Sequence, residues 1–501
     1  MNKNMFNKFK QIMSKYDTLI LFAFLLICSI GPILYIQVSV SDEIWNFQNV
    51  LKLFNGLEIY KDANIIITPL FYYIAIIFCK IFGGTLITFK IYNVFLTAIL
   101  SILVYKLFTA LKVTKLKSSI YSLIIYILII YLATYGANYN VLSAIFFLVG
   151  VLLSIKELRF NSKAYNFLQA FMIFLIFLTK QNIAVYYTIA LIIVEFILCK
   201  KRYKNFFVSV LTKIIITLVF ISMFLIVISY KGQLNNFINY TVLGIPEFAS
   251  NLAIQINTLI NLGVVFTISV IAIMSILYKN NSIQIDSEIK VKIIKLLVFG
   301  LFMQLTAYPI FNIYHSMLGA IVIYILGFYL IDIIFISNFI KTKKYLFGIM
   351  VVITILIYIY SMYNLINYIK YMKFDRSEDI TVFKNTIVSE ETKEKISVIN
   401  KYIKDKEKIG INVIIFSQDA AIYMIPLNKN NQAMDLPFLG NMGADGENNM
   451  LEKIKSLKNN EIMIVKDEKE VFWQESKLVR KYIIDNFNCI GEIENFKIYV
   501  L

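Results

Sequence analysis

The feature that most constrains this sequence is a series of long apolar stretches separated by short polar connections. Stretches of roughly 16 to 27 mainly apolar residues, the length of a helix that crosses a bilayer, recur about eleven times. They fall near residues 18–38, 85–108, 119–135, 139–155, 164–179, 182–199, 206–230, 252–278, 292–309, 314–337 and 345–366. We therefore predict an α-helical polytopic membrane protein whose transmembrane domain covers residues 1–370.

Composition agrees with a lipid environment and excludes other classes of protein. Hydrophobic residues make up 59% of the 501 residues, as expected of a chain that is solvated mainly by lipid. The net charge of +17 does not indicate nucleic-acid binding, because Lys and Arg stand in short clusters between apolar stretches. The four Cys and the single His, His315, indicate neither a disulfide framework nor a His-rich metal cage. We expect no cofactor, with a divalent metal as the less favoured alternative.

The stretch from Pro69 to Gly83 is apolar but short, and it could either cross the membrane or lie in its interface. Charge decides between the two, since loops that stay in the cytoplasm collect Lys and Arg. The basic clusters lie at 3–15, 112–117, 156–163, 200–204, 279–295 and 341–344. If 69–83 does not cross, all of them fall on the side of the N-terminus; if it crosses, every later cluster falls outside. We predict an interfacial segment at 69–83, a cytoplasmic N-terminus and a location in the cell membrane.

After about Met372 the composition becomes that of a soluble domain, which eleven crossings place outside the cytoplasm. Short β-rich runs alternate with helical patterns, which indicates a small extracytoplasmic α/β domain at 371–501. The predicted strands are 412–417, 461–466 and 496–501, and the predicted helices are 389–408, 447–458 and 474–487. The Gly-rich stretch 439–446 matches neither common phosphate-binding motif, so nucleotide binding is not predicted there.

The polar connections with few charges all fall on the outer side in this topology. They are 41–68, 137–140, 179–182, 231–250 and 308–315. We therefore expect a site at the outer membrane surface, with a catalytic first outer loop at 39–68. The two intramembrane acids, Glu195 and Asp332, lie near inner helix ends, where basic loop residues can pair with them. We interpret both as structural.

Four residues of these outer connections are candidates for chemistry. Asp42 and Glu43 follow the first apolar stretch. A carboxylate there can act as a general base, and neighbours on a helix point about 100° apart, so we expect one of the two to face the reacting centre; simple solvation of a helix end is the alternative. Lys180 stands at an outer helix end, where it could bind a phosphate or reach lipid headgroups. His315 could donate to a phosphate, shuttle protons or be structural.

The order of these motifs resembles that of the GT-C glycosyltransferases. This group of multi-span enzymes includes polyprenyl-phosphate-sugar-dependent protein mannosyltransferases and bacterial aminoarabinose transferases. The matching elements are a first span followed by Asp42-Glu43, then Pro69-Leu70-Phe71-Tyr72-Tyr73, Thr179-Lys180-Gln181-Asn182, and Tyr-Pro-x-x-Asn-x-x-His at 308–315. The resemblance covers residues 1–370, and the C-terminal domain is similar to the extracytoplasmic domain of many members.

The resemblance implies a hexosyl- or pentosyltransferase that moves a sugar from a polyprenyl-phosphate carrier to an extracytoplasmic glycan, lipid or protein. Asp42 would be the catalytic base, with Glu43 as its acidic neighbour. The residues that would bind the donor phosphate or substrate are Lys61, Asp62, Lys180, Gln181, Asn312 and His315. This chain has Asn138 and Asn140 where several relatives carry an acidic residue, and Asn312 where some have Asp. Since amides are weaker ligands than carboxylates, no metal site is expected.

Other functions stay open from sequence. They are a lipid-linked-sugar flippase or other transporter, a polysaccharide polymerase or ligase, and a non-catalytic membrane scaffold. A transporter is expected to show internal repeats and helices broken at the membrane midplane. No repeat is visible, and the informative polar residues cluster at outer helix ends.

The charge distribution predicts which positions face the outside of the cell. Single cysteines at Lys115 and Lys341, in a variant without the four native cysteines, should be protected from a membrane-impermeant maleimide in intact cells. Cysteines at Lys231 and at position 450 should react, because Asn138, Lys231 and the whole domain after Met372 are predicted to lie outside. Protection at position 450 would contradict this orientation.

Overall fold

The computed structural model describes most of the chain. It covers residues 3–38, 42–156, 162–199, 201–245, 256–277, 286–308, 310–335, 343–371, 378–429, 439–444, 446–457, 460–467, 469, 471 and 475–500. Positions 39–41 of the predicted first outer loop lie outside the described residues, as do Arg159, Lys200 and Lys341 of the predicted basic clusters.

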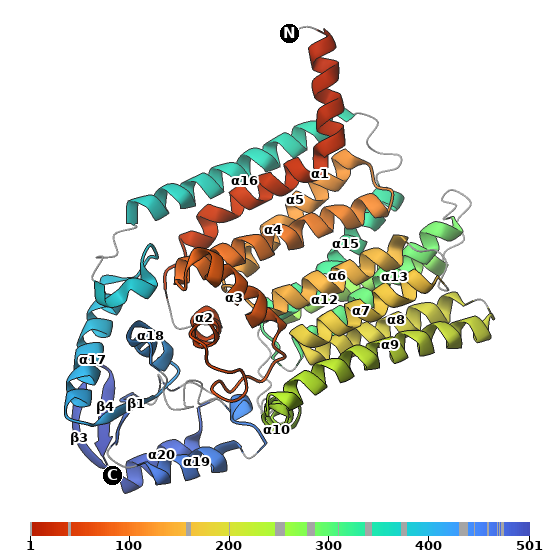
Figure 1. Cartoon of the computed structure of the whole chain (residues 1–501). Coiled ribbons are helices and arrows are strands. Elements are labelled where there is room, and N and C mark those ends of the chain that lie inside the picture. The colour runs from red at the N-terminus through yellow and green to blue at the C-terminus, as the bar shows by residue number, and fades with distance from the viewer. Residues whose placement is uncertain are drawn as a thin grey trace.

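Long helices dominate the fold and lie side by side in one bundle (Figure 1). They are α1 (Lys3–Leu34), α4 (Leu86–Ala110), α5 (Lys115–Ala133), α6 (Tyr139–Lys156), α7 (Lys163–Thr179), α8 (Gln181–Leu198), α9 (Tyr203–Tyr230), α12 (Ile256–Leu277), α13 (Ser287–Gln304), α14 (Ile313–Gly319), α15 (Ile321–Leu330) and α16 (Lys343–Tyr371). Some turn apolar side chains outward: α9 exposes Phe207, Leu218 and Met223. An apolar helix with such a surface is suited to lipid rather than water.

Among the described residues, eight helices are long and apolar enough to cross a membrane, or nine if the pair α14 and α15, bent by 50°, counts as one span. The two other predicted spans are also helical. α7 has only 17 residues, and α13 carries charged side chains at Glu288, Lys290, Lys292 and Lys295. Every apolar stretch predicted to span is therefore helical over most of the part that the structure describes, and the predicted polytopic helical fold is confirmed.

Contacts between connections define the two ends of the bundle. At one end, Lys115 at the start of α5 pairs with Asp17 of α1 at 2.7 Å, and Lys112 pairs with Glu288 of α13 at 2.8 Å. At the other end, the connections 42–68, 138–140, 180–182 and 239–243 contact one another. We call this second end the α2 end, after α2 (Asp42–Phe54). Basic and low-charge connections thus separate to opposite ends, as the positive-inside rule requires.

The predicted interfacial segment forms α3 (Leu70–Phe82), a helix of 13 residues. At 1.5 Å per residue it is about 20 Å long, shorter than the roughly 30 Å of a hydrocarbon core. Gly84, just after α3, lies against Phe54 at the end of α2: a Cβ on Gly84 would come within 2.8 Å of the Phe54 ring. After α3, which packs against α2, α4 and α7, the chain therefore returns to the end of α2 before α4 begins.

The C-terminal residues build a four-stranded sheet in the order β1-β2-β4-β3. β1 (Asn412–Phe416) pairs parallel to β2 (Asn460–Val465), while β4 (Phe496–Val500) pairs antiparallel with β2 and with β3 (Asn488–Ile493). Helices α17 (Glu390–Lys408), α19 (Gly446–Ser456) and α20 (Lys477–Asn486) accompany the sheet. The predicted small α/β fold is confirmed, and β3 is an additional strand. The sequence of β3 gives little signal because this edge strand is largely exposed and lacks a buried apolar face.

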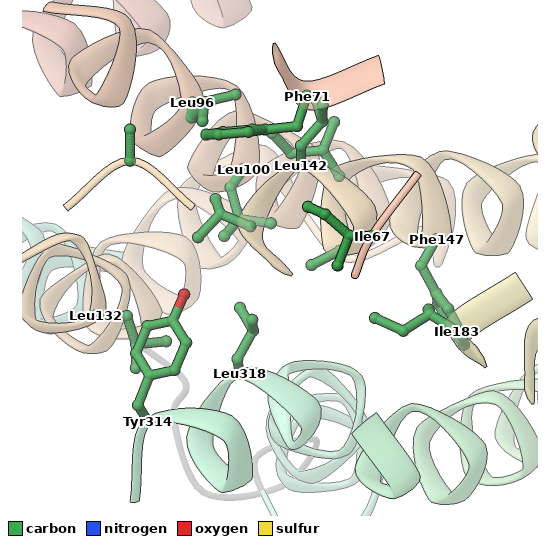
Figure 2. Close-up of a cluster of buried hydrophobic side chains, with 14 of the residues drawn as sticks. Ile67, Phe71, Leu96, Leu100, Leu132, Leu142, Phe147, Ile183, Tyr314 and Leu318 are labelled. Carbon is green, nitrogen blue, oxygen red and sulfur yellow. The ribbon is translucent and has the colours of Figure 1, made fainter. Parts of the chain in front are cut away.

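An apolar core lies between the helices near the α2 end. Figure 2 shows side chains from several elements meeting there, and all are buried. The labelled residues are Ile67, Phe71, Leu96, Leu100, Leu132, Leu142, Phe147, Ile183, Tyr314 and Leu318. Because nearly all of these side chains come from helices far apart in sequence, their packing fixes the positions of the polar groups at the ends of the same helices.

The two intramembrane acids have partners. Asp332 pairs with Lys117 at the start of α5, where the sequence predicts a basic partner. Glu195 pairs instead with Lys213 inside α9, with Oε1 and Nζ 2.7 Å apart and only 1% and 4% of the side chains exposed. Both partners of this second pair are therefore buried within the bundle.

Removing one member of the Glu195–Lys213 pair should destabilise the protein far more than replacing both. Lys213→Met leaves a buried carboxylate without its cation, which typically costs about 3–5 kcal/mol. Adding Glu195→Gln should restore most of the loss in thermal unfolding in detergent. A Lys213→Met variant as stable as wild type would show that the pair is not structural.

Candidate active site

Helix α2 carries the acidic pair to the junction between the bundle and the C-terminal domain. Asp42 and Glu43 occupy its first turn, where carboxylates interact favourably with the partial positive charge of a helix N-terminus. On the other side, the Trp45 indole N–H donates to the Gln418 carbonyl of the C-terminal domain at 3.1 Å. α2 is therefore held from two sides.

Glu43 faces into the bundle and forms a buried ion pair. Its Oε2 lies 2.9 Å from Nζ of Lys90, and the two side chains are 4% and 0% exposed. Lys90 also donates to the Ile36 carbonyl, just beyond α1, at 3.1 Å. Gly136 packs against Glu43 so closely that a Cβ there would lie 2.3 Å from the Glu43 Cβ. The start of α2 is thus fixed to α1, α4 and the second connection, and the ion pair gives Glu43 a structural partner.

Asp42 points elsewhere and begins a chain of hydrogen bonds. Asn138 Nδ2 donates to Asp42 Oδ2 at 3.0 Å, and Asn138 Oδ1 accepts from Asn140 Nδ2 at 2.7 Å. Lys180 Nζ then donates to Asn140 Oδ1 at 2.6 Å. The Lys180 ammonium also lies 5.5 Å from the centre of the Tyr139 ring, within range of a cation–π contact. Two amides therefore connect a carboxylate to an ammonium group.

The charges of Asp42 and Lys180 affect each other. Burial raises the pKa of Asp42, while the Asn138 hydrogen bond and the Lys180 charge lower it. Burial lowers the pKa of Lys180 to about 8, against the opposing effect of the Asp42 charge. A raised carboxyl pKa makes Asp42 a stronger base than a solvated aspartate.

Gln181 connects the other loops of the α2 end. Its Nε2 donates to the Ile66 carbonyl at 3.0 Å and to the Thr241 carbonyl at 2.8 Å. Ile66 lies before α3, and Thr241 belongs to η1 (Asn239–Leu243). Gln181 thereby positions its neighbour Lys180 among three connections.

Asn312 and His315 lie at the start of α14. Asn312 Oδ1 caps the helix by accepting from the His315 backbone N–H at 2.9 Å, and it lies 2.8 Å from His315 Nδ1. His315 and Asn140 line the same small cavity of about 10 Å³, about the space of one water molecule. His315 thus lies beside the Asp42–Lys180 chain, and Asn312 sets the orientation of the His315 ring.

Lys61 and Asp62 make their contacts within their own loop. Lys61 pairs with Glu58 at 3.2 Å, with 65% and 44% of the two side chains exposed. Asp62 Oδ2 accepts from the Glu58 backbone N–H at 2.7 Å. Among the described residues, no contact joins Lys61 or Asp62 to the Asp42–Lys180 chain. Their predicted role in binding the donor therefore stays a prediction.

Three residues of the site were not singled out as functional from sequence. Asn138 and Asn140 appear there only as departures from an acidic pattern, yet they join Asp42 to Lys180. Tyr314 is buried, its hydroxyl has no hydrogen-bond partner among the described residues, and it interacts electrostatically with Asp42. Buried tyrosine hydroxyls are seldom left unpaired, and the unpaired hydroxyl together with the Asp42 interaction distinguishes Tyr314 from the other tyrosines buried in the apolar core.

A resident metal would need several hard ligands in one place. Among the described residues, no group of three or more His, Cys, Asp or Glu side chains is close enough to hold a metal ion. The amides of Asn138 and Asn140 are occupied by the hydrogen bonds above. The expectation that no metal takes part therefore stays a prediction.

The chain was compared with known proteins. No model of a protein family matches it, and no curated protein matches its sequence. ArnT from Cupriavidus metallidurans in the apo state has a similar structure, with a TM-score of 0.55 and 8% identity over 97% of this chain and 98% of its own. The archaeal oligosaccharyltransferase AglB from Archaeoglobus fulgidus, in complex with an inhibitory peptide and a dolichol-phosphate, has a TM-score of 0.51 and 10% identity over 90% of this chain and 70% of its own. The resemblance to GT-C proteins predicted from sequence is thus confirmed for the fold.

The pKa of Lys180 predicts how anion binding depends on pH. A lysine with a lowered pKa is charged below that pKa and neutral above it, so affinity for a phosphodiester anion should fall as pH rises through about 8. Lys180→Arg should remove this dependence, because arginine stays charged. Binding of a polyprenyl-phosphate sugar between pH 6.5 and 9.5 measures the effect. Equal pH profiles for wild type and Lys180→Arg would exclude Lys180 as the titrating group.

Proposed function

We propose that this protein is a membrane glycosyltransferase that moves a sugar from a polyprenyl-phosphate carrier to an extracytoplasmic acceptor. The observation that carries the proposal is the chain from Asp42 through Asn138 and Asn140 to Lys180. This chain of hydrogen bonds fixes a base, Asp42, and a cation, Lys180, relative to each other at one end of the helical bundle. Glycosyl transfer from a lipid phosphate needs both groups, one for the acceptor proton and one for the departing phosphate.

In this mechanism Asp42 accepts the proton of the acceptor hydroxyl as its oxygen attacks the anomeric carbon of the donor sugar. The bond between that carbon and the phosphate oxygen breaks, and its electron pair leaves with the phosphate. Lys180 stabilises the negative charge on the phosphate. His315 lies beside Asn140 with its Nδ1 proton directed at the Asn312 oxygen, so Nε2 of the neutral ring is an acceptor, and the predicted hydrogen bond to the phosphate would require the protonated ring. Glu43 holds α2 in position and does not take part in proton transfer, because its carboxylate pairs with Lys90.

A groove in the bundle supports a lipid donor. It has a volume of about 280 Å³ and lies between α7, α8 and α9, with an almost wholly apolar lining. Along α8 it extends from Gln181, the neighbour of Lys180, to Glu195, a length of about 21 Å at 1.5 Å per residue. We propose that the polyprenyl chain lies here. The surface of α3 is the alternative: Phe71 and Tyr72 are buried in the core, but Tyr73, Ile77, Ile81 and Phe82 are exposed.

The comparisons support the same donor class without fixing it. The AglB structure contains a dolichol-phosphate, which is a polyprenyl-type phosphate. A nucleotide-sugar donor would call for a phosphate-cradling loop on the cytoplasmic side, and the sequence has no such motif. We place the N-terminus in the cytoplasm, residues 1–370 in the cell membrane and residues 371–501 outside, with the α2 end at the outer surface.

Replacing Asp42 tests the proposal. Asp42→Asn keeps the size and a hydrogen-bonding group but removes the base, so turnover with a polyprenyl-phosphate sugar should fall at least about 100-fold. Donor binding should change much less, since Lys180 remains.

The matched control is Glu43→Gln, the same change one residue along α2. It should reduce thermal stability through the loss of the Lys90 pair while leaving more turnover per folded molecule. Wild-type turnover by Asp42→Asn would remove the carboxylate base from the mechanism.

A further inference from the structure

A second cleft lies between α2 and the C-terminal domain, away from the lipid groove. It has a volume of about 280 Å³ and is open on one side. Its lining comes from the second half of α2 with the residues after it, and from the turn η5 (Ile425–Leu427) with Asn428 and Lys429. The Asn55 Nδ2 donates to Asn428 Oδ1 at 2.6 Å and joins the two walls.

The lining of this cleft combines amides, cations and small apolar patches. Gln48, Asn55 and Asn428 supply amides, and Lys429 supplies positive charge at the surface, whereas Lys52 is 4% exposed and donates to the Asp62 carbonyl at 3.3 Å. A second cation, Lys404, lies close enough to Lys429 for its charge, together with burial, to lower the pKa of Lys429. The acidic group paired with Lys429 is Glu407. Amides bind hydroxyl groups, and lysines bind anions.

Helix geometry connects this cleft to Asp42. Trp45, Asn49 and Lys52 follow Asp42 at intervals of three, seven and ten residues, which places them along one side of α2. The distance from Asp42 to the cleft residues Gln48 and Lys52 is about 9 to 15 Å along the helix axis. The aromatic ring of Trp45 lies between them and is partly exposed, and it can stack on a sugar ring. Asp42 and Trp45 do not line the cleft, so only an extended ligand, longer than the cleft itself, could reach from it to Asp42.

We infer that this cleft binds the acceptor and that the acceptor is an extended glycan chain carrying negative charge. The inference rests on the proposed function, because only a transferase has an acceptor. It gives the C-terminal domain a role: η5, Asn428 and Lys429 form the wall that faces the chain.

The test uses full-length protein in nanodiscs and two probes of equal chain length, dextran sulfate and neutral dextran. The sequence contains two tryptophans, so Trp473→Phe leaves Trp45 as the sole reporter of binding near α2. Dextran sulfate should change the Trp45 fluorescence at concentrations at least tenfold lower than dextran.

Two variants and one control locate the binding site. Lys429→Gln should weaken dextran sulfate binding about tenfold, the scale of one charge-assisted contact. Asn428→Gly should also weaken it, and glycine keeps the left-handed backbone, φ 54°, of this position. Lys466→Gln is the control, because Lys466, which follows β2, also pairs with a glutamate, Glu492 at 2.7 Å, but does not line the cleft.

The outcomes separate the cleft from the catalytic proposal. Weakening by Lys429→Gln and not by Lys466→Gln supports the cleft, whether or not Asp42→Asn is inactive. Equal effects of the two lysine variants, or equal binding of dextran and dextran sulfate, would overturn the inference and leave the role of Asp42 untouched. In turnover assays, Lys429→Gln should raise KM for an anionic glycan acceptor while kcat and donor release stay near wild type.

Discussion

The buried ion pair between Glu43 and Lys90 is the interaction on which the site depends. A charge at zero exposure is tolerated only with a close partner, and here the pair also holds the Ile36 carbonyl and lies against Gly136. It therefore sets both the position and the rotation of α2. Because Asp42 and Glu43 are neighbours on one helix, fixing Glu43 inward directs Asp42 toward the second connection. In the proposed mechanism, Glu43 therefore anchors α2 and Asp42 takes part in the chemistry.

The rest of the α2 end is arranged around that fixed helix. Asn138 and Asn140 lead from Asp42 to Lys180, and Gln181 connects the loops next to it. The lipid groove begins at Gln181 on one side, and the cleft toward the C-terminal domain follows α2 on the other. In the proposed function, a donor bound in the groove along α8 and an acceptor bound in the cleft would therefore approach Asp42 from different sides.

Sequence predicts the features that arise from solvent and leaves open those that arise from packing. Apolar length and lysine clusters report on the bilayer, so the helices and the separation of the two ends can be derived from them. The positions of Asp42 and Lys180 follow from the same pattern. Their connection does not, because Asn138 and Asn140 look like ordinary loop amides until the helices are packed. Lys90 offered a usable signal: a lysine inside an apolar span needs a buried partner.

The central claim is that the donor is a lipid-linked sugar, and substrate choice by the purified protein tests it most directly. Protein in nanodiscs is supplied with a panel of radiolabelled polyprenyl-phosphate sugars, and separately with UDP- and GDP-sugars in the absence of lipid carrier. Release of free polyprenyl phosphate together with labelled acceptor from the first set, and no transfer from the second, is the predicted result. Efficient transfer from a nucleotide sugar without carrier would contradict the account, since neither the Lys180 site nor the groove along α8 would then be needed.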